Sequence, residues 1–99
     1  MNVNDLNNLA AAHRARGEAA EAERLYLEAL ATKEKALGPD HPDLAVTFHH
    51  LAALFADLGR SAEARSIYRH ALDIFVRTLG PAHPHSQACR AGYAGLHKN

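Results

Sequence analysis

Histidine is the residue type in this chain best suited to chemistry, because imidazole binds metals and transfers protons near neutral pH. The 99 residues include eight histidines, among them His41, the neighbours His49 and His50, and the sequence His83-Pro84-His85. A zinc site usually needs three or four protein ligands. His83 and His85 have no carboxylate nearby in the sequence. His49 and His50 point to different sides of their helix, because adjacent helical residues are about 100° apart. We therefore expect no metal and no cofactor, and we expect His41 and His83 to cap or pack beside the prolines that follow them.

The other nucleophilic residue types give little support for catalysis. Cys89 lies four residues after His85, but a lone helical cysteine is usually a small packing residue. The sequence has no glycine-rich phosphate loop and no recognisable nucleophile and base motif. We expect that the chain is not an enzyme. One cysteine cannot form an internal disulfide, and neither a signal peptide nor an apolar run of about 20 residues is present, so we expect a cytoplasmic protein with no membrane partner.

The charges balance overall but not along the chain. Lysine and arginine number 11, as do aspartate and glutamate, so no net field attracts nucleic acid. Residues 1–50 hold five basic and eight acidic residues, whereas residues 51–99 hold six basic and three acidic residues. The two halves therefore carry opposite net charge.

The chain repeats itself with a period of 42 residues. Residues 1–42 and 43–84 share 15 identical pairs, nearly all of them small, apolar or turn residues. Each copy ends in a Leu-Gly-Pro-x-His-Pro sequence, at 37–42 and 79–84. This distribution is typical of a stacked array, in which each repeat covers an apolar face that its neighbour cannot bury alone.

Helical periodicity fills every segment between these turns, and none shows the alternation of a half-buried strand. Five helices are predicted within one domain, 1–99, that holds two full repeats, about 1–42 and 43–84, and a half repeat, 85–99. The expected helix limits are Asn4 or Asp5 to Gly17, about Glu18 to Leu37, Pro42 to Gly59, Ser61 to Gly80, and Pro84 to the end. Glycine and proline end or begin each one. In the fifth helix, an apolar stripe is expected at Ala88, Ala91, Tyr93, Ala94 and Leu96.

The pattern Ala22-x3-Tyr26-x2-Ala29 and its copy Ala64-x3-Tyr68-x2-Ala71 resemble the tetratricopeptide repeat. The longer period and its linker are similar to the 42-residue variety found in kinesin light chains. The resemblance covers essentially the whole chain and implies an all-α superhelix of five antiparallel helices, the fifth acting as a cap. It also implies that the small residues let helix backbones approach closely.

The resemblance further implies an adaptor or scaffold that binds a partner peptide on the concave surface, which the first helix of each pair lines. The exposed face of these two helices supplies six candidate residues: Asn4, Asn7, Arg14, Val46, His49 and Asp57. Asn7 resembles a residue that hydrogen-bonds the main chain of the partner, but His49 and Ala91 replace it in the later copies. A solvated helix surface is the alternative interpretation of Asn7.

The second function that we consider is a structural module that assembles with itself. Ile74, Phe75 and Val76 are consecutive apolar residues that one packing seam cannot bury together, so either the fifth helix or another subunit is expected to cover them. Two and a half repeats also leave both ends poorly covered. The opposite charges of the two halves favour a dimer, and head-to-tail stacking or exchange of helices through the Gly38-Pro39 or Gly80-Pro81 linker remain alternatives.

Overall fold

Five helices in antiparallel stacking make up the protein, which confirms the predicted all-α class. The computed structural model describes residues 3–96 of the 99, and the side chains from Asp5 to Leu96. The helices are α1 (Val3–Ala15), α2 (Ala19–Leu37), α3 (Pro42–Asp57), α4 (Ser61–Leu79) and α5 (Pro84–Gly95). No helix in this part of the chain is long and apolar enough to span a membrane.

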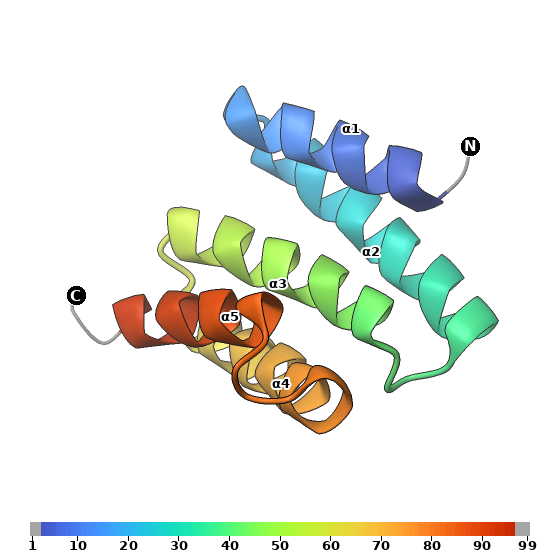
Figure 1. Ribbon diagram of the computed structural model, residues 1–99. Helices are drawn as coiled ribbons and strands as arrows, with labels where there is room; N and C mark the ends of the chain where they lie inside the picture. The colour runs from blue at the N-terminus through green and yellow to red at the C-terminus, as the bar shows by residue number, and fades with distance from the viewer. Residues whose placement is uncertain (1–2, 97–99) are drawn as a thin grey trace.

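The helices pack in sequence order as two hairpins and a final helix (Figure 1). The contacts within the pairs α1–α2 and α3–α4 are the most extensive, and α2–α3 and α4–α5 join the pairs. The molecule measures 35 × 32 × 19 Å, so it is thin in one direction. Because α1 and α3 lie on the same side of their own pairs, they can form one continuous face.

The turns between helices have the residues that their geometry requires. Gly17 and Gly59 end the first helix of each pair at φ values of 77° and 76°, a left-handed conformation that other residues rarely adopt. At the linkers, the Nδ1 atoms of His41 and His83 accept hydrogen bonds from the backbone N–H two residues later, at 3.0 Å each. The predicted capping role of these two histidines is confirmed, and each cap precedes a proline in the first turn.

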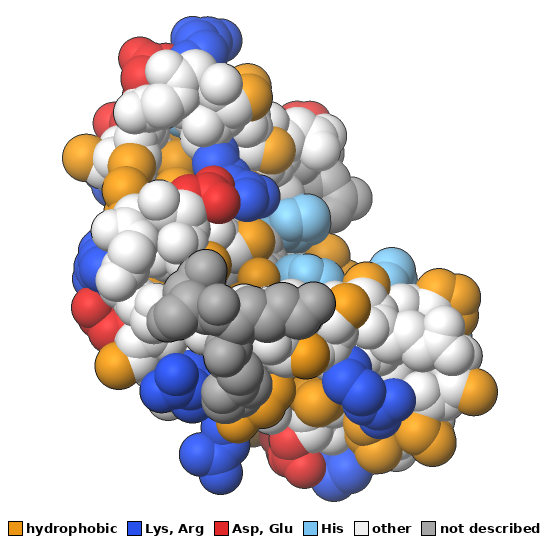
Figure 2. Space-filling view, turned by 90° about the vertical axis from the view of Figure 1, so that its left-hand side faces the viewer, with side chains coloured by type: hydrophobic (Ala, Val, Ile, Leu, Met, Phe, Trp, Pro, Cys, Tyr) orange, Lys and Arg blue, Asp and Glu red, His pale blue; other side chains and the backbone are white. Residues whose placement is uncertain are grey.

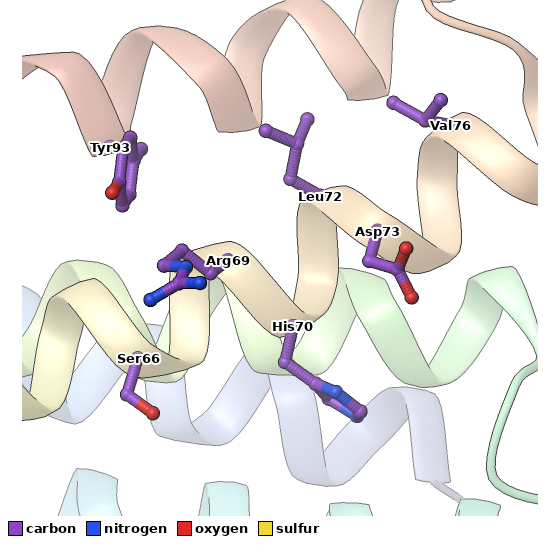
Figure 3. A pocket seen from close by; sticks show the side chains of 7 residues that line it. All are labelled: Ser66, Arg69, His70, Leu72, Asp73, Val76 and Tyr93. Carbon is purple, nitrogen blue, oxygen red and sulfur yellow. The ribbon is translucent and has the colours of Figure 1, made fainter.

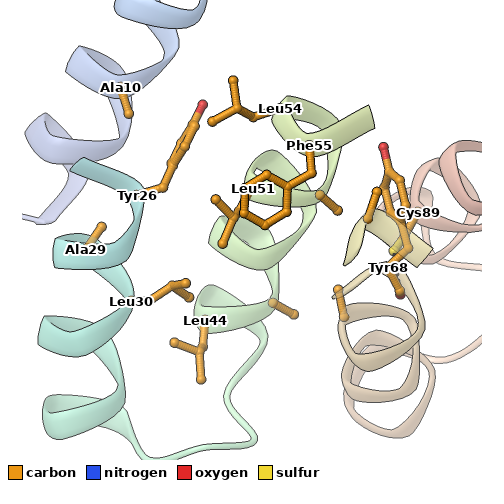
Figure 4. Close-up of a cluster of buried hydrophobic side chains, with 14 of the residues drawn as sticks. Ala10, Tyr26, Ala29, Leu30, Leu44, Leu51, Leu54, Phe55, Tyr68 and Cys89 are labelled. Atoms are coloured by element: carbon orange, nitrogen blue, oxygen red, sulfur yellow. Dashed lines mark hydrogen bonds between the residues drawn. The ribbon is translucent and has the colours of Figure 1, made fainter. Parts of the chain in front are cut away.

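Many residues of the core are ones that the two copies share (Figure 4). Tyr26 and Tyr68 are 1% and 4% exposed, and they fill the space between neighbouring helices. Alanines that show no exposed surface surround them and let the helices approach closely. These alanines are Ala10, Ala22, Ala29, Ala52, Ala64 and Ala71. The seam predicted from the repeat is therefore confirmed.

The fifth helix buries a face that agrees only in part with the one predicted. Ala88, Ala91 and Ala94 are exposed, whereas Ser86 and Cys89 are fully buried. The Ser86 hydroxyl donates to the Gly80 carbonyl at 2.7 Å, and the Cys89 thiol lies 3.4 Å from the Tyr68 carbonyl. The prediction for the three alanines was wrong, because α5 buries the same face as α3: Ser86 and Cys89 stand one period after the buried residues Leu44 and Thr47. The prediction for Leu96 is confirmed, since this residue is 8% exposed.

The apolar residues Ile74 and Phe75 lie inside the chain and show no exposed surface. The Phe75 ring lies 5.4 Å from the ring of His85 on α5, so the fifth helix helps to cover it. This removes Ile74 and Phe75 from the expected oligomer surface. Of the three residues, only Val76 remains partly exposed.

Candidate functional site

The concave face of α1 and α3 is hollowed at two places along its length. One hollow of about 480 Å³ is lined by Asn7, Asn8, Lys33, Asp43, Val46 and His50. A second, of about 400 Å³, is lined by Ala11, Arg14, Ala15, Tyr26, His50 and Asp57. His50 lines both, so the two hollows form one feature, which we call the concave groove. Figure 2 shows histidine side chains gathered in this notch, next to a basic and an acidic side chain.

Five of the six predicted groove residues have described side chains; that of Asn4 lies outside the described residues. Asn7, Arg14, Val46 and Asp57 line the groove. His49 lies in the same region, with its ring centroid 6.0 Å from that of His50.

Arg14 and Asp57 bind each other across the groove. Arg14 Nε donates to Asp57 Oδ2 at 2.7 Å, and this hydrogen bond raises the pKa of Arg14. The two charges are thus paired within the chain, although the sequence placed them on the groove as separate charges. The pair is partly exposed, at 32% and 54% for the two side chains, so it joins α1 to α3 with a modest contribution to stability.

Asn7 also has a partner within the chain. Its Oδ1 accepts a hydrogen bond from the Thr47 hydroxyl on α3 at 3.2 Å, and Thr47 is fully buried. This contact orients the carboxamide, because its oxygen is held against α3. Among the residues that the structure describes, none accepts a hydrogen bond from the amide nitrogen of Asn7. That nitrogen therefore remains a donor at the groove.

Lys33 is a groove residue that the sequence analysis missed. It belongs to α2, is 7% exposed, and its Nζ donates to the Asp43 carbonyl at 3.0 Å. Burial lowers the pKa of its ammonium group. One signal was available: the matching residue of the second repeat is Phe75, which is fully buried. A lysine at a position that packs inside the fold must extend its charged end toward a surface, and here that surface is the concave groove.

The aromatic floor of the groove combines histidines with the buried tyrosines. His50 stacks on Tyr26, with ring centroids 6.0 Å apart and an interplanar angle of 6°. His49 meets the Tyr68 ring edge at 5.6 Å. The sequence predicted that the two histidines point to different sides, but their rings stack at 28°, because both side chains lie over the tyrosines.

Burial sets the ionisation of these groups. It lowers the pKa of His49 and His50, and neighbouring positive charge, that of Arg14 included, adds to the effect. Burial also raises the pKa of Tyr26, whose hydroxyl is buried without a hydrogen-bond partner in the described chain. The groove is thus a largely neutral aromatic surface between the donors Asn7 and Lys33 and the Arg14–Asp57 pair.

Residues 3–96 contain no group of three histidine, cysteine, aspartate or glutamate side chains that could hold a metal. Cys89 lies outside the groove, and burial raises the pKa of its thiol to about 11. It is thus protonated at neutral pH and has little nucleophilic character.

The geometry agrees with the comparison of the sequence with known families. A tetratricopeptide repeat profile matches residues 4–76 and again residues 43–97. The chain belongs to the tetratricopeptide repeat family. The two matches of this TPR chain overlap over residues 43–76, which is most of the second repeat. Such repeats are generally protein–protein interaction modules and are typically not catalytic.

Two solved structures are similar to this TPR chain. One holds nearly identical TPR-like repeats of a Podosopora anserina protein assigned as a kinesin light chain; it is 25% identical, with a TM-score of 0.86. A single-substitution variant of those repeats is 27% identical, with a TM-score of 0.78. Each match covers 97% of this chain and 46% or 45% of the other, so this chain spans less than half of their length. No curated protein matches the sequence significantly. The predicted resemblance to kinesin-light-chain-like repeats is confirmed.

Proposed function

We propose that this chain is an adaptor that binds a peptide of a partner protein in the concave groove. The observation that carries the proposal is the donor pair at one hollow of the groove. The Asn7 amide nitrogen has no acceptor within the described chain, and Lys33 Nζ is bound to a single carbonyl, that of Asp43. An extended peptide presents carbonyl oxygens at regular intervals, and such donors can bind them.

The aromatic floor of the groove supplies apolar contact area for a bound peptide. Val46 and the His50 ring line the same hollow as Asn7, and Tyr26 supports His50 from below. Binding sites of this kind combine apolar walls with a few polar groups that fix the orientation of the ligand. The His49 and His50 rings remain mostly neutral at pH 7, so they contribute apolar surface and not charge.

The test is a binding measurement with groove variants. Because the ligand is unidentified, the probe is an immobilised array of random peptides, and the peptides bound most strongly are synthesised and measured by calorimetry. We expect the double variant Asn7→Ala, His49→Ala to weaken binding at least about tenfold, since it removes a donor and aromatic contact area. The control is Gln87→Ala, an exposed residue of α5 away from the groove.

Two outcomes contradict this proposal. Unchanged affinity in the double variant shows that the peptides bind elsewhere. Equal loss in Gln87→Ala shows that the effect does not come from the groove. Circular dichroism of each variant establishes that the loss of binding is not a loss of structure.

A second candidate function is self-assembly, which one observation favours. A shallow hollow of about 750 Å³ lies between α4 and α5, outside the concave groove (Figure 3). Its lining includes Val76, the one predicted oligomer residue that is still accessible, along with Leu72 and Tyr93. We call it the α4–α5 hollow. An accessible apolar surface next to charged side chains is typical of sites where proteins associate.

A further inference from the structure

We infer that the α4–α5 hollow receives α4 of a second copy of this chain, so that two antiparallel α4 helices meet about a two-fold axis. The inference rests on the second candidate function, self-assembly, and names its surface and symmetry. It does not depend on peptide binding in the concave groove.

A comparison with the first repeat indicates that a helix fits the α4–α5 hollow. Leu72 and Tyr93 in the hollow stand one 42-residue period after Leu30 and Leu51. The earlier pair is only 8% and 3% exposed, because α3 packs against α2 and α4 packs against α3. The later pair stays partly exposed, since no further helix follows α5 within residues 3–96. A helix from outside the described chain can cover these side chains in the same way.

The outward face of α4 has the spacing of a helix-packing seam. Residues separated alternately by four and three positions lie along it, which is the pattern by which two helices meet. They are Ala62, Ser66, Arg69, Asp73, Val76 and the C-cap residue Gly80. The set is symmetric about position 71. In an antiparallel pair of α4 helices, Ser66 of each copy therefore faces Val76 of the other, and Arg69 faces Asp73.

The charges at the centre of this seam complement each other only between copies. Arg69 has no ion-pair partner in the described chain. Asp73 pairs with Arg77 at 2.8 Å, and Arg77 is shared with Asp40 at 3.2 Å. In the antiparallel arrangement each Arg69 gains an aspartate, and each Asp73 gains a second cation. A shift of the register by four residues sets Arg69 against Arg69 or Asp73 against Asp73, so the charges select one register.

The corresponding face of α2 is the main competitor. Leu27 and Ala31 stand there at the positions of Arg69 and Asp73, and Leu27 is 47% exposed. However, Leu30, beside this face, is already buried. A second helix on α2 therefore gains no hollow to fill, which favours α4.

The test uses sedimentation equilibrium of charge variants at low salt. We expect the wild-type chain to form dimers, and Arg69→Asp and Asp73→Arg each to weaken dimerisation at least about tenfold, because like charges then face each other. An equimolar mixture of these two variants should dimerise as the wild type does. In the mixed dimer an arginine of one copy faces an aspartate of the other at both positions. Leu27→Asp and Ala31→Arg are the matched controls on α2 and should leave the dimer intact.

Three results overturn the inference. A wild-type chain that stays monomeric up to sub-millimolar concentration refutes both the α4 interface and self-assembly. Dissociation by Leu27→Asp in place of Arg69→Asp refutes the α4 interface but supports self-assembly through α2. A mixture that stays monomeric when each single variant has dissociated shows that Arg69 and Asp73 do not face each other. Urea unfolding of each variant separates a lost interface from a lost fold.

Discussion

Replacing Tyr26 by phenylalanine should stabilise this protein, although tyrosine is the residue that both repeats share at this position. Tyr26 is 1% exposed, and its hydroxyl is buried without a hydrogen-bond partner in the described chain. Burying a hydroxyl without a partner costs about 1–3 kcal/mol. Its removal leaves a gap of one oxygen atom, which costs only about 0.3 kcal/mol at roughly 24 cal/mol per Å³. We therefore expect the free energy of unfolding to rise by about 1–2 kcal/mol.

Tyr68→Phe is the matched control for this prediction. Tyr68 occupies the same position in the second repeat and is 4% exposed, but its hydroxyl is not among the buried atoms that lack a partner. We expect its substitution to change stability by less than about 0.5 kcal/mol. Urea and thermal unfolding followed by circular dichroism measure both variants, and a gain of 1 kcal/mol raises the Tm by about 4–8 °C in a domain of this size. Destabilisation by Tyr26→Phe, or equal effects at the two positions, would refute the reasoning.

Two further predictions concern α5 and the groove histidines. An added Cβ at Gly92 would lie 2.7 Å from the Tyr68 ring, whereas nothing lies within 4 Å of an added Cβ at Gly95. Gly92→Ala should therefore lower the unfolding free energy by about 1–3 kcal/mol, because the new methyl group overpacks the core. Gly95→Ala should raise the unfolding free energy by up to about 1 kcal/mol, because alanine favours the helix more than glycine does. Equal changes of the urea unfolding free energy in Gly92→Ala and Gly95→Ala would contradict this prediction. Burial holds the pKa of His49 and His50 below the usual 6.5. As the pH falls, the unfolded chain therefore binds protons that the folded chain does not. The unfolding free energy should thus fall as the pH drops below about 6.5. Urea midpoints between pH 5 and 8 should show this slope, and it should flatten in the double variant His49→Gln, His50→Gln; an unchanged slope in that variant would contradict the assignment.

The sequence was most informative where one residue type satisfies a local requirement. Ala29 and Ala71 recur because the close approach of two helices leaves no room for a larger side chain, and both are fully buried. His41 and His83 recur because a side-chain acceptor is needed at the start of the following helix. Such requirements repeat with the period of the chain, so they can be recognised without knowledge of how the helix pairs are arranged.

The prediction failed where the apolar residues of the fifth helix were taken as its buried face. Ser86, Cys89 and Leu96 are buried, and they stand one period after Leu44, Thr47 and Leu54, which are also buried, so α5 buries the same face as α3. Ala91 is exposed because it does not lie on that face. The requirement for glycine at position 92 likewise depends on tertiary structure, because the Tyr68 ring leaves no space there for a side chain.

The sequence by itself thus determined the five helices, their turns and the seam that joins them, because these depend on spacing along the chain. Only the tertiary structure decided what the groove presents. Asn7 meets Thr47, and Arg14 meets Asp57, across 40 and 43 residues of sequence, and Lys33 reaches the groove from α2. Such contacts depend on how two helices cross and on which rotamers their side chains adopt. Helical periodicity specifies the face on which a residue lies, but not the residue that it meets there.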